Sequence, residues 1–347
     1  MPAIRLGLIG CGNIESTHEA AALALAGDVE IVATADVQED RAVRAARRVG
    51  ARHAATRHAD ILPHVDAVVI ALPHDLHHLV GLDCLTAGKH VLMEKPLAIT
   101  ERDCLELVRA GRQAGRVLMT GYLMRFHPLV LALKERIDAK VDGDAFQVSI
   151  WTEQHTEPPP GHWIRSAQRL GGGQFLSHGC HYVDLLLWLL GRPESGTHVG
   201  TRLGTPWLEG EGTSNAAIAF AGGAVGYHFG TWGARGTRLR SVIHVHATEG
   251  MLEADLSRGR LALVRGADER VLLETGTVKP ALAQLAHFVA SIRDGARPLT
   301  DGAASVQSLR VIWRLYDAER RGVVADLRGL GLDDLADAPD VVDMRSP

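Results

Sequence analysis

Short apolar runs alternate with helix-period segments over the first third of the chain. The runs lie at residues 4–9, 31–34, 67–70, 90–93 and 117–120. Between them, residues 38–49, 76–87 and 100–114 carry apolar side chains at the three- and four-residue spacing of a helix face. Because strands that alternate with helices form parallel sheets, this pattern predicts an α/β Rossmann-like domain over residues 1–122.

The pattern changes after residue 122. A helix is expected at 128–137, and strand-like runs follow at 146–153, 197–203, 215–220, 225–231, 239–247, 251–255, 261–264 and 271–274. Strands without intervening helices predict a second α+β domain over residues 123–328, built on an open-faced, largely antiparallel sheet. Thr248, Glu249 and Gly250 predict a hairpin turn. Helices at 281–294 and 303–320 are expected to pack back on the first domain or on both, and residues 329–347 to form an acidic tail.

Composition narrows the class of protein. The 347 residues are 46% hydrophobic and 22% charged, which suits two domains with substantial cores. A net charge of -4 without a basic block argues against nucleic acid and favours a small-molecule partner. Nothing approaches a signal peptide or a membrane span. The four cysteines form no Cys-x-x-Cys pair, so we expect a cytoplasmic protein with reduced thiols.

A glycine turn indicates a dinucleotide site. Gly10-Cys11-Gly12 lies between a strand and a helix that begins near Asn13, where backbone N–H groups can bind a pyrophosphate. Glu15 departs from this motif because the third position is normally Gly or Ala. Asp36 ends the second strand, where its carboxylate can accept hydrogen bonds from the ribose hydroxyls and repel a 2'-phosphate. This favours NAD over NADP, although Arg41 leaves NADP open. The alternative is a tight turn, with Asp36 capping a helix.

Further motifs follow in order along the chain. They are Leu72-Pro73-His74 with His77-His78, the stretch 87–96 that ends in Glu94-Lys95-Pro96, Gly121-Tyr122 with Arg125-Phe126 and Pro128, and Gly171-Gly172-Gly173 through Gly179-Cys180-His181 to Asp184. With Gly10 to Ile14 and His18, their order and spacing resemble the Gfo/Idh/MocA oxidoreductase family from residue 4 to about residue 322. The resemblance implies a dehydrogenase with nicotinamide held between a Rossmann domain and an open-faced sheet.

The resemblance also implies the site residues. Those expected to bind NAD are Gly10, Gly12, Asn13, Ile14, Asp36, Pro73, His74, His77, Glu94 and Lys95, with His74 standing where the family often has asparagine. Those expected to bind substrate are Lys95, Tyr122, Arg125, Trp163, Arg165, Ser177 and His181. Trp163 and Arg165 loosely match a Trp-x-Arg region of the family, on a loop that three consecutive prolines stiffen.

The chemistry of alcohol oxidation requires a base and a cation. A hydride leaves carbon and a proton leaves oxygen, so a base must take the proton while a cation stabilises the developing alkoxide. The resemblance gives these roles to His181 and Lys95, and Lys95 ends a parallel strand, where such sheets hold ligands. Asp184, three residues after His181, shares its helix face and is expected to orient the imidazole. Alternatively, His181 caps the helix and Asp184 lies on the surface.

Many family members carry aspartate four residues before the histidine, where this chain has Ser177, followed by His178. The proton relay is therefore expected to differ in detail, and Ser177 to hydrogen-bond substrate.

We predict an NAD-dependent oxidoreductase acting on a secondary alcohol of a sugar, amino sugar, cyclitol or glycoside. Eighteen histidines raise the possibility of a metal, but His74, His77 and His78, or His178 and His181, lack a zinc-motif spacing, so none is predicted. The sequence contains no Gly-x-Ser-x-Gly motif, so it does not indicate a serine hydrolase. The alternative is a non-catalytic NAD- or sugar-binding sensor on the same fold. Because open sheet faces are usually covered, we expect a homodimer or homotetramer.

Overall fold

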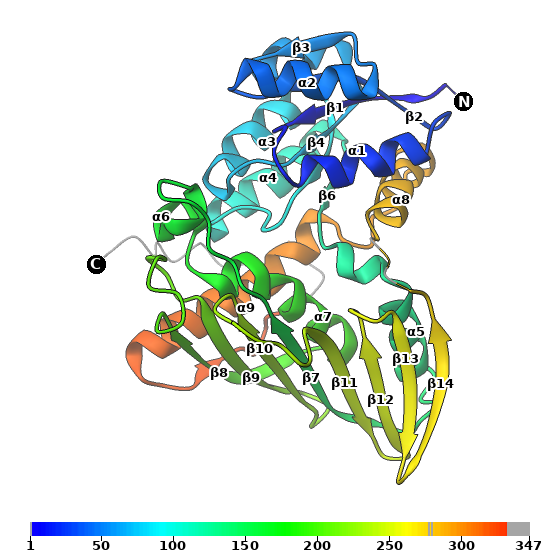
Figure 1. Ribbon diagram of the computed structural model, residues 1–347, viewed down its shortest axis with the longest axis vertical. Coiled ribbons are helices and arrows are strands. Elements are labelled where there is room, and N and C mark those ends of the chain that lie inside the picture. Colours follow the sequence, from blue (N-terminus) through cyan, green and yellow to red (C-terminus); the bar gives the residue numbers. More distant parts are fainter. Residues whose placement is uncertain (1, 277, 279, 332–347) are drawn as a thin grey trace.

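A six-stranded parallel sheet forms the upper part of the computed structural model in Figure 1, which describes residues 2–276, 278 and 280–331. Its order is β3-β2-β1-β4-β5-β6. The strands are β1 Ile4–Ile9, β2 Val29–Ala35, β3 His53–Ala55, β4 Ala67–Ile70, β5 His90–Met93 and β6 Leu118–Thr120. The helices between them are α1 Glu15–Ala24, α2 Glu39–Val49, α3 His77–Thr86 and α4 Glu101–Ala114. The predicted Rossmann arrangement is confirmed, with β3 as an additional short strand.

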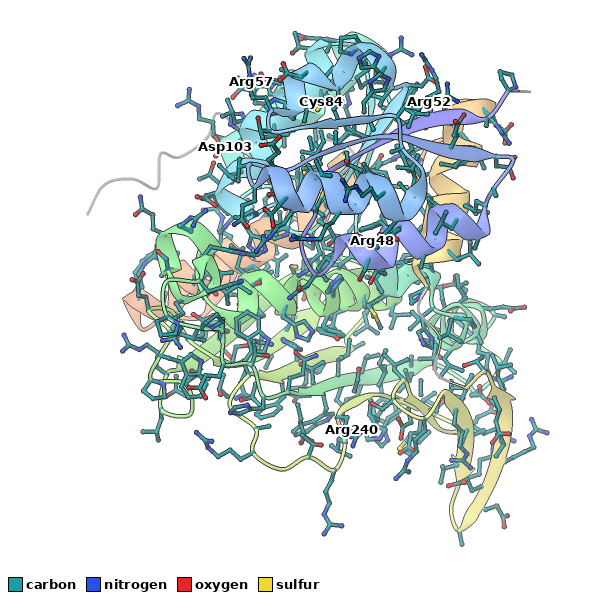
Figure 2. The ribbon with its side chains drawn as sticks, turned by 45° about the horizontal axis from the view of Figure 1, so that its top comes forward. Arg48, Arg52, Arg57, Cys84, Asp103 and Arg240 are labelled. Atoms are coloured by element: carbon teal, nitrogen blue, oxygen red, sulfur yellow. The ribbon has the colours of Figure 1, made fainter. Side chains whose placement is uncertain are left out.

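Local sequence explains these boundaries. All four residues of β4 are buried, which fits a central parallel strand covered on both faces and accounts for its unbroken apolar run. Helix α4 begins where the Thr100 hydroxyl accepts a hydrogen bond from the backbone N–H of Asp103, and it ends at Gly115 in the left-handed conformation. Arg48 of α2 pairs with Glu19 of α1 at 2.9 Å, and Figure 2 labels Arg48 beside these two helices.

A nine-stranded mixed sheet forms the lower part of Figure 1, in the order β14-β13-β12-β11-β7-β10-β9-β8-β15. Its strands are β7 Ala145–Glu153, β8 Pro193–Thr201, β9 Thr213–Phe220, β10 Val225–Thr231, β11 Ser241–Ala247, β12 Gly250–Asp255, β13 Arg260–Arg265, β14 Asp268–Glu274 and β15 Ala325–Asp326. β10 runs parallel to β7, whereas the other paired neighbours run antiparallel. The prediction of a largely antiparallel sheet is confirmed. The pairing of Ala247 with Gly250 leaves Thr248 and Glu249 as the predicted hairpin turn.

The remaining helices connect the two sheets. They are α5 Pro128–Asp138, α6 Ala167–Leu170, α7 Cys180–Leu190, α8 Ala281–Asp294 and α9 Gly302–Arg321. Helix α8 packs against α1, and its Leu285 and Phe288 enter the same core cluster as Leu6 of β1. Helix α9 contacts both α4 and α7, and Arg310 of α9 forms an ion pair with Glu101 of α4 at 2.6 Å. The part of the chain that the structure describes contains no helix with the length and apolar run needed to cross a bilayer.

Candidate active site

The glycine turn after β1 is built for close approach of a ligand to the backbone. Gly10 has φ +91°, and a Cβ there would lie 2.2 Å from the carbonyl oxygen of Ala71, so only glycine fits. A Cβ at Gly12 would meet nothing within 4 Å, which leaves open space over the turn. Asn13 and Ile14 are exposed beside it. The side chain of Glu15 lies outside the described part of the structure.

Asp36 is fixed beside this turn by backbone hydrogen bonds. Its Oδ2 accepts from the N–H of Cys11 and its Oδ1 from the N–H of Gln38, both at 2.8 Å. A carboxylate has about four lone-pair sites, so these two bonds leave acceptors for a pair of ribose hydroxyls. The geometry therefore holds the carboxylate of Asp36 and the glycine turn together, as expected for a dinucleotide site.

Glu94, at the end of β5, forms a buried ion pair with His18 of α1. The Nε2 of His18 lies 2.7 Å from Oε1 of Glu94, with the two residues only 2% and 8% exposed. Burial alone would raise the pKa of Glu94, but the hydrogen bond to His18 and the charge of Lys95 outweigh it and hold the pKa below its ordinary value. Glu94 is thus an anion directly before Lys95, behind the position expected for the cofactor.

The rings of His74 and His77 contact backbone carbonyls of neighbouring loops. Pro73 precedes the short helical turn in which His74 lies, and the Nδ1 of His74 donates to the carbonyl of Leu170 at 2.9 Å. Both ring nitrogens of His77 face carbonyl oxygens, of Pro96 at 2.8 Å and Leu72 at 2.9 Å. Burial lowers the pKa of both histidines. Both nitrogens of His77 thus lie against backbone carbonyls, and the contact of His77 with the cofactor stays a prediction.

Lys95 and His181 meet at an irregular turn of helix. The Nζ of Lys95 donates to the backbone carbonyl of Ser177 at 2.8 Å, and Ser177 lies in the π-helical turn Phe175–Gly179 that leads into α7. His181 follows in the first turn of α7 and is 6% exposed. Its ring packs edge-on against Tyr122 with centroids 5.8 Å apart. Burial, together with the charges of Lys95 and His178, lowers the pKa of His181 well below its ordinary value, so its imidazole is neutral.

Asp184 does not orient His181, which corrects the prediction from helix spacing. Its two carboxylate oxygens accept from Nε and Nη2 of Arg125, each at 2.7 Å, and Nη1 of Arg125 donates to the carbonyl of Leu299 at 3.1 Å. Burial raises the pKa of Asp184 despite the lowering effect of Arg125. Among the described residues, Nδ1 of His181 has no hydrogen-bond partner. Helix spacing correctly placed Asp184 on the same face of the helix as His181. It could not show that Asp184 pairs with Arg125, which lies 59 residues earlier in the sequence.

Two predicted substrate ligands have structural roles instead. Arg125 is 8% exposed and committed to Asp184, so it is not free to bind substrate. Tyr122 is 1% exposed, and its hydroxyl lies 3.0 Å from that of Ser308. Tyr122 therefore packs buried against the ring of His181, and its contact with a substrate stays a prediction.

The proline-rich loop after β7 brings Trp163 to the Rossmann side. Trp163 is half-buried, and its ring contacts that of His74 edge-on with centroids 4.7 Å apart. The Nε of Arg165 donates to the carbonyl of Pro158 at 2.7 Å, which stiffens the loop.

At the end of β7, Oε2 of Glu153 accepts from three consecutive backbone N–H groups ending at Arg240, in a loop that Figure 2 shows turned away from the Rossmann sheet.

Four supporting residues escaped the sequence analysis because their partners are distant in sequence. The hydroxyl of Tyr316 donates to Oε1 of Glu211 at 2.5 Å and accepts from the N–H groups of Gly173 and Leu176, both at 3.3 Å. A Cβ at Gly173 would lie 2.2 Å from Oε2 of Glu211, so this glycine admits the carboxylate. Gln174 and Ser214 form a further buried hydrogen bond below the turn. No local pattern marks any of the four.

The described residues contain one group of three potential metal ligands, and it includes neither Lys95 nor His181. His78 of α3 faces Asp103 and Glu106 of α4, and the Nε2 of His78 is 3.0 Å from Oε2 of Glu106. The group is partly exposed, and the distances are those of ordinary surface ion pairs.

The fold and these residues define a two-part NAD-binding oxidoreductase: a Rossmann sheet with a glycine turn and the anchored carboxylate of Asp36, an open-faced mixed sheet, and a lysine that binds the turn leading into a neutral histidine. The chain belongs to the Gfo/Idh/MocA family. Residues 4–122 match the family model described as "Oxidoreductase family, NAD-binding Rossmann fold", and residues 130–253 match "GFO/IDH/MocA C-terminal domain".

Among the curated relatives are proteins named as inositol dehydrogenases. The chain is 33% identical over 196 residues to inositol 2-dehydrogenase 2 of Saccharopolyspora erythraea, a match that covers 54% of each chain. In such matches the chain spans about half the length of the curated relatives. It is 24% identical over 336 residues to scyllo-inositol 2-dehydrogenase (NAD(+)) of Bacillus subtilis, covering 93% of this chain and 96% of that one.

Solved structures show the same fold over nearly the whole chain. Levoglucosan dehydrogenase in complex with NADH and L-sorbose superimposes with a TM-score of 0.86 at 22% identity, covering 94% of this chain and 99% of that one. The WlbA dehydrogenase of Bordetella pertussis, in complex with NADH and UDP-GlcNAcA, superimposes with a TM-score of 0.81 at 25% identity, covering 94% and 98%.

Proposed function

We propose that the protein transfers a hydride from a secondary alcohol of a sugar, amino sugar, cyclitol or glycoside to NAD. In this proposal Lys95 contacts the reacting oxygen and His181 accepts its proton. The observation that carries the proposal is the hydrogen bond from Lys95 Nζ to the carbonyl of Ser177, at 2.8 Å. It joins the carboxyl end of β5 to the turn that leads into His181, so that a cation and a neutral base lie on directly connected segments.

The charges suit proton removal from an alcohol. Because burial keeps His181 neutral, its imidazole has a lone pair available at neutral pH. A base with a lowered pKa is a weaker acceptor, but the ammonium of Lys95 stabilises the developing alkoxide and thereby lowers the pKa of the alcohol. The hydride then passes from carbon to C4 of the nicotinamide that NAD supplies.

Cofactor preference follows from Asp36. Its anchored carboxylate favours two free ribose hydroxyls and disfavours a 2'-phosphate, which supports NAD over NADP. The substrate class is supported by relatives named as inositol dehydrogenases and a structural neighbour named as levoglucosan dehydrogenase.

We further propose that residues 1–122 bind NAD and that residues 123–328 bind substrate. The second of these domains is also proposed to assemble the protein as a homodimer or homotetramer. The support for assembly is a set of exposed apolar residues on the second sheet: Phe146 at 49%, Val199 at 66% and Tyr227 at 42%. A second copy would remove this surface from water. Cys84, Cys104 and Cys180 are buried thiols, which supports work in a reducing compartment such as the cytoplasm.

A substrate panel tests the proposal. Wild-type protein is mixed with NAD or NADP and with myo-inositol, scyllo-inositol, levoglucosan or an amino sugar, and the absorbance of reduced nicotinamide is followed. We expect turnover with at least one compound, and loss of most of it in His181→Ala, while the distant His53→Ala control keeps wild-type rates. Tight NAD binding without turnover of any polyhydroxylated compound would support the sensor alternative instead.

A further inference from the structure

His178 lies in the π-helical turn whose Ser177 carbonyl binds Lys95 and which leads into His181. It lies one residue after Ser177, whose carbonyl holds Lys95, and its ring is 6.2 Å from that of His181. It also contacts the rings of Tyr182 at 5.2 Å and Trp232 at 6.5 Å. The side chain is half-buried rather than enclosed, so part of the imidazole remains accessible.

One nitrogen of His178 is tied to a buried amide whose orientation the structure defines. Gln174 and Ser214 are both completely buried, and the Oγ of Ser214 lies 2.5 Å from Oε1 of Gln174. That distance suits O–H···O and is too short for an ordinary N–H···O bond, so the amide oxygen faces the serine. The amide nitrogen of Gln174 then faces Nδ1 of His178 at 3.4 Å. Gly230 supports this arrangement, since a Cβ there would lie 2.2 Å from the same nitrogen.

This chain of hydrogen bonds sets the tautomer of His178. The amide of Gln174 donates, so Nδ1 must accept and the single proton of the neutral ring is on Nε2. The ring stays neutral because burial, followed by the charges of Lys95 and His228, lowers its pKa to about 3. The amide nitrogen of Gln154 lies 3.5 Å from Nε2, so in this orientation two donors face each other. Because Gln154 is exposed, its amide can turn its oxygen toward Nε2–H or be displaced by a ligand, whereas the buried amide of Gln174 cannot turn.

We propose that His178 is a specificity-determining residue that donates its Nε2–H to an acceptor oxygen of the substrate beside the reacting alcohol. Gln174 and Ser214 act as positioning residues that hold the donor tautomer. The inference rests on the proposed function and deepens it, because Lys95 and His178 now supply two donors and only His181 supplies an acceptor. Such a site favours sugars in which a ring ether or carbonyl oxygen, which has no hydrogen of its own, neighbours the oxidised carbon.

The tautomer is measured directly by long-range ¹H–¹⁵N NMR on full-length protein labelled at histidine. In the wild type we expect His178 as the neutral Nε2–H form from pH 5 to 8. Gln174→Glu replaces the donor with a carboxylate acceptor of the same shape and should convert the ring to the Nδ1–H form or to the cation. Ser214→Ala should leave a mixture of tautomers. A wild-type His178 that carries its proton on Nδ1, or that is charged at pH 7, overturns the inference.

Kinetics test the consequence for specificity. The probes are levoglucosan, which has a ring oxygen beside a carbinol, and myo-inositol, in which every oxygen is a hydroxyl. The measured quantity is the kcat/KM for levoglucosan divided by the kcat/KM for myo-inositol. We expect His178→Leu and Gln174→Glu to lower this ratio about tenfold, mainly through KM for levoglucosan, because an unpaired acceptor costs that much. His178→Gln, which keeps an N–H donor, should restore most of it.

The two failures can be told apart. Wild-type turnover with a ratio that His178→Leu leaves unchanged overturns this inference alone. Absence of wild-type turnover with both compounds overturns the proposed function, and this inference with it, whichever tautomer is found. His53→Gln, on β3 of the Rossmann sheet, is the matched histidine control and should change neither the spectrum of His178 nor the ratio.

Discussion

Asp184→Asn separates a structural role for this carboxylate from the catalytic one that its position beside His181 suggests. Asp184 is 1% exposed and Arg125 8% exposed, and two hydrogen bonds of 2.7 Å join them. Removing one partner of a buried ion pair typically costs about 3–5 kcal/mol, because the remaining charge is left without compensation. Asparagine keeps one oxygen acceptor, so we expect about 3 kcal/mol of lost unfolding free energy.

The assay is urea denaturation followed by tryptophan fluorescence, at one fixed protein concentration because an oligomer would make stability depend on it. The double variant Arg125→Met with Asp184→Leu replaces the pair by apolar groups, and methionine can pack where Arg125 now lies 5.2 Å from the ring of Trp188. We expect the free energy of unfolding of the double variant to lie only about 1 kcal/mol below that of the wild type. The difference reflects the lost hydrogen bond from Arg125 to the carbonyl of Leu299. An Asp184→Asn protein of wild-type stability but lowered turnover would refute this reasoning and restore the orienting role.

Three other variants or conditions test neighbouring parts of the site. Lys95→Ala should lower turnover by about a hundredfold while leaving the dissociation constant for NAD nearly unchanged in calorimetry, since Lys95 is proposed to act on substrate oxygen; lost NAD affinity with normal turnover would reverse the assignment. Gly10→Ala should fail to fold stably because its Cβ would lie 2.2 Å from a backbone oxygen, whereas Gly12→Ala should melt at the wild-type temperature and bind NAD more weakly; equal melting temperatures would contradict the contrast. Burial lowers the folded-state pKa of His178 and His228 to about 3, so below pH 6.5 the unfolded chain binds more protons and each histidine removes up to about 1.4 kcal/mol of stability per pH unit; a melting temperature that stays constant from pH 7 to pH 5 would contradict this.

The sequence predicted the elements whose signal is local. The unbroken apolar run of β4 and the helix period of α4 each reflect burial of adjacent residues, so their positions were predicted to within a few residues. The three-residue strand β3 was missed because none of its residues is fully buried and so no apolar run marks it. Pairing of β10 parallel to β7 depends on contacts between strands more than 70 residues apart, which local periodicity does not record.

The candidate site shows the same division. The proximity of Gly10 and Asp36 could be predicted from the sequence because each follows the end of one of two neighbouring parallel strands. The role of Asp184 could not, since helix spacing identifies the face of a side chain but not its partner, here Arg125 on another segment. The sequence showed His178 only as the neighbour of Ser177 and as a rejected metal ligand, because the amide that sets its tautomer is itself fixed by a serine 40 residues later.

Direct transfer of hydrogen from substrate carbon to nicotinamide is the central claim. The measurement is mass spectrometry of the reduced cofactor formed from NAD and a polyol deuterated at the carbon that is oxidised. The account predicts NADH that carries one deuterium, formed by the wild type and nearly absent with His181→Ala. Reduced cofactor without deuterium, or no reduced cofactor from any polyhydroxylated substrate, would contradict it.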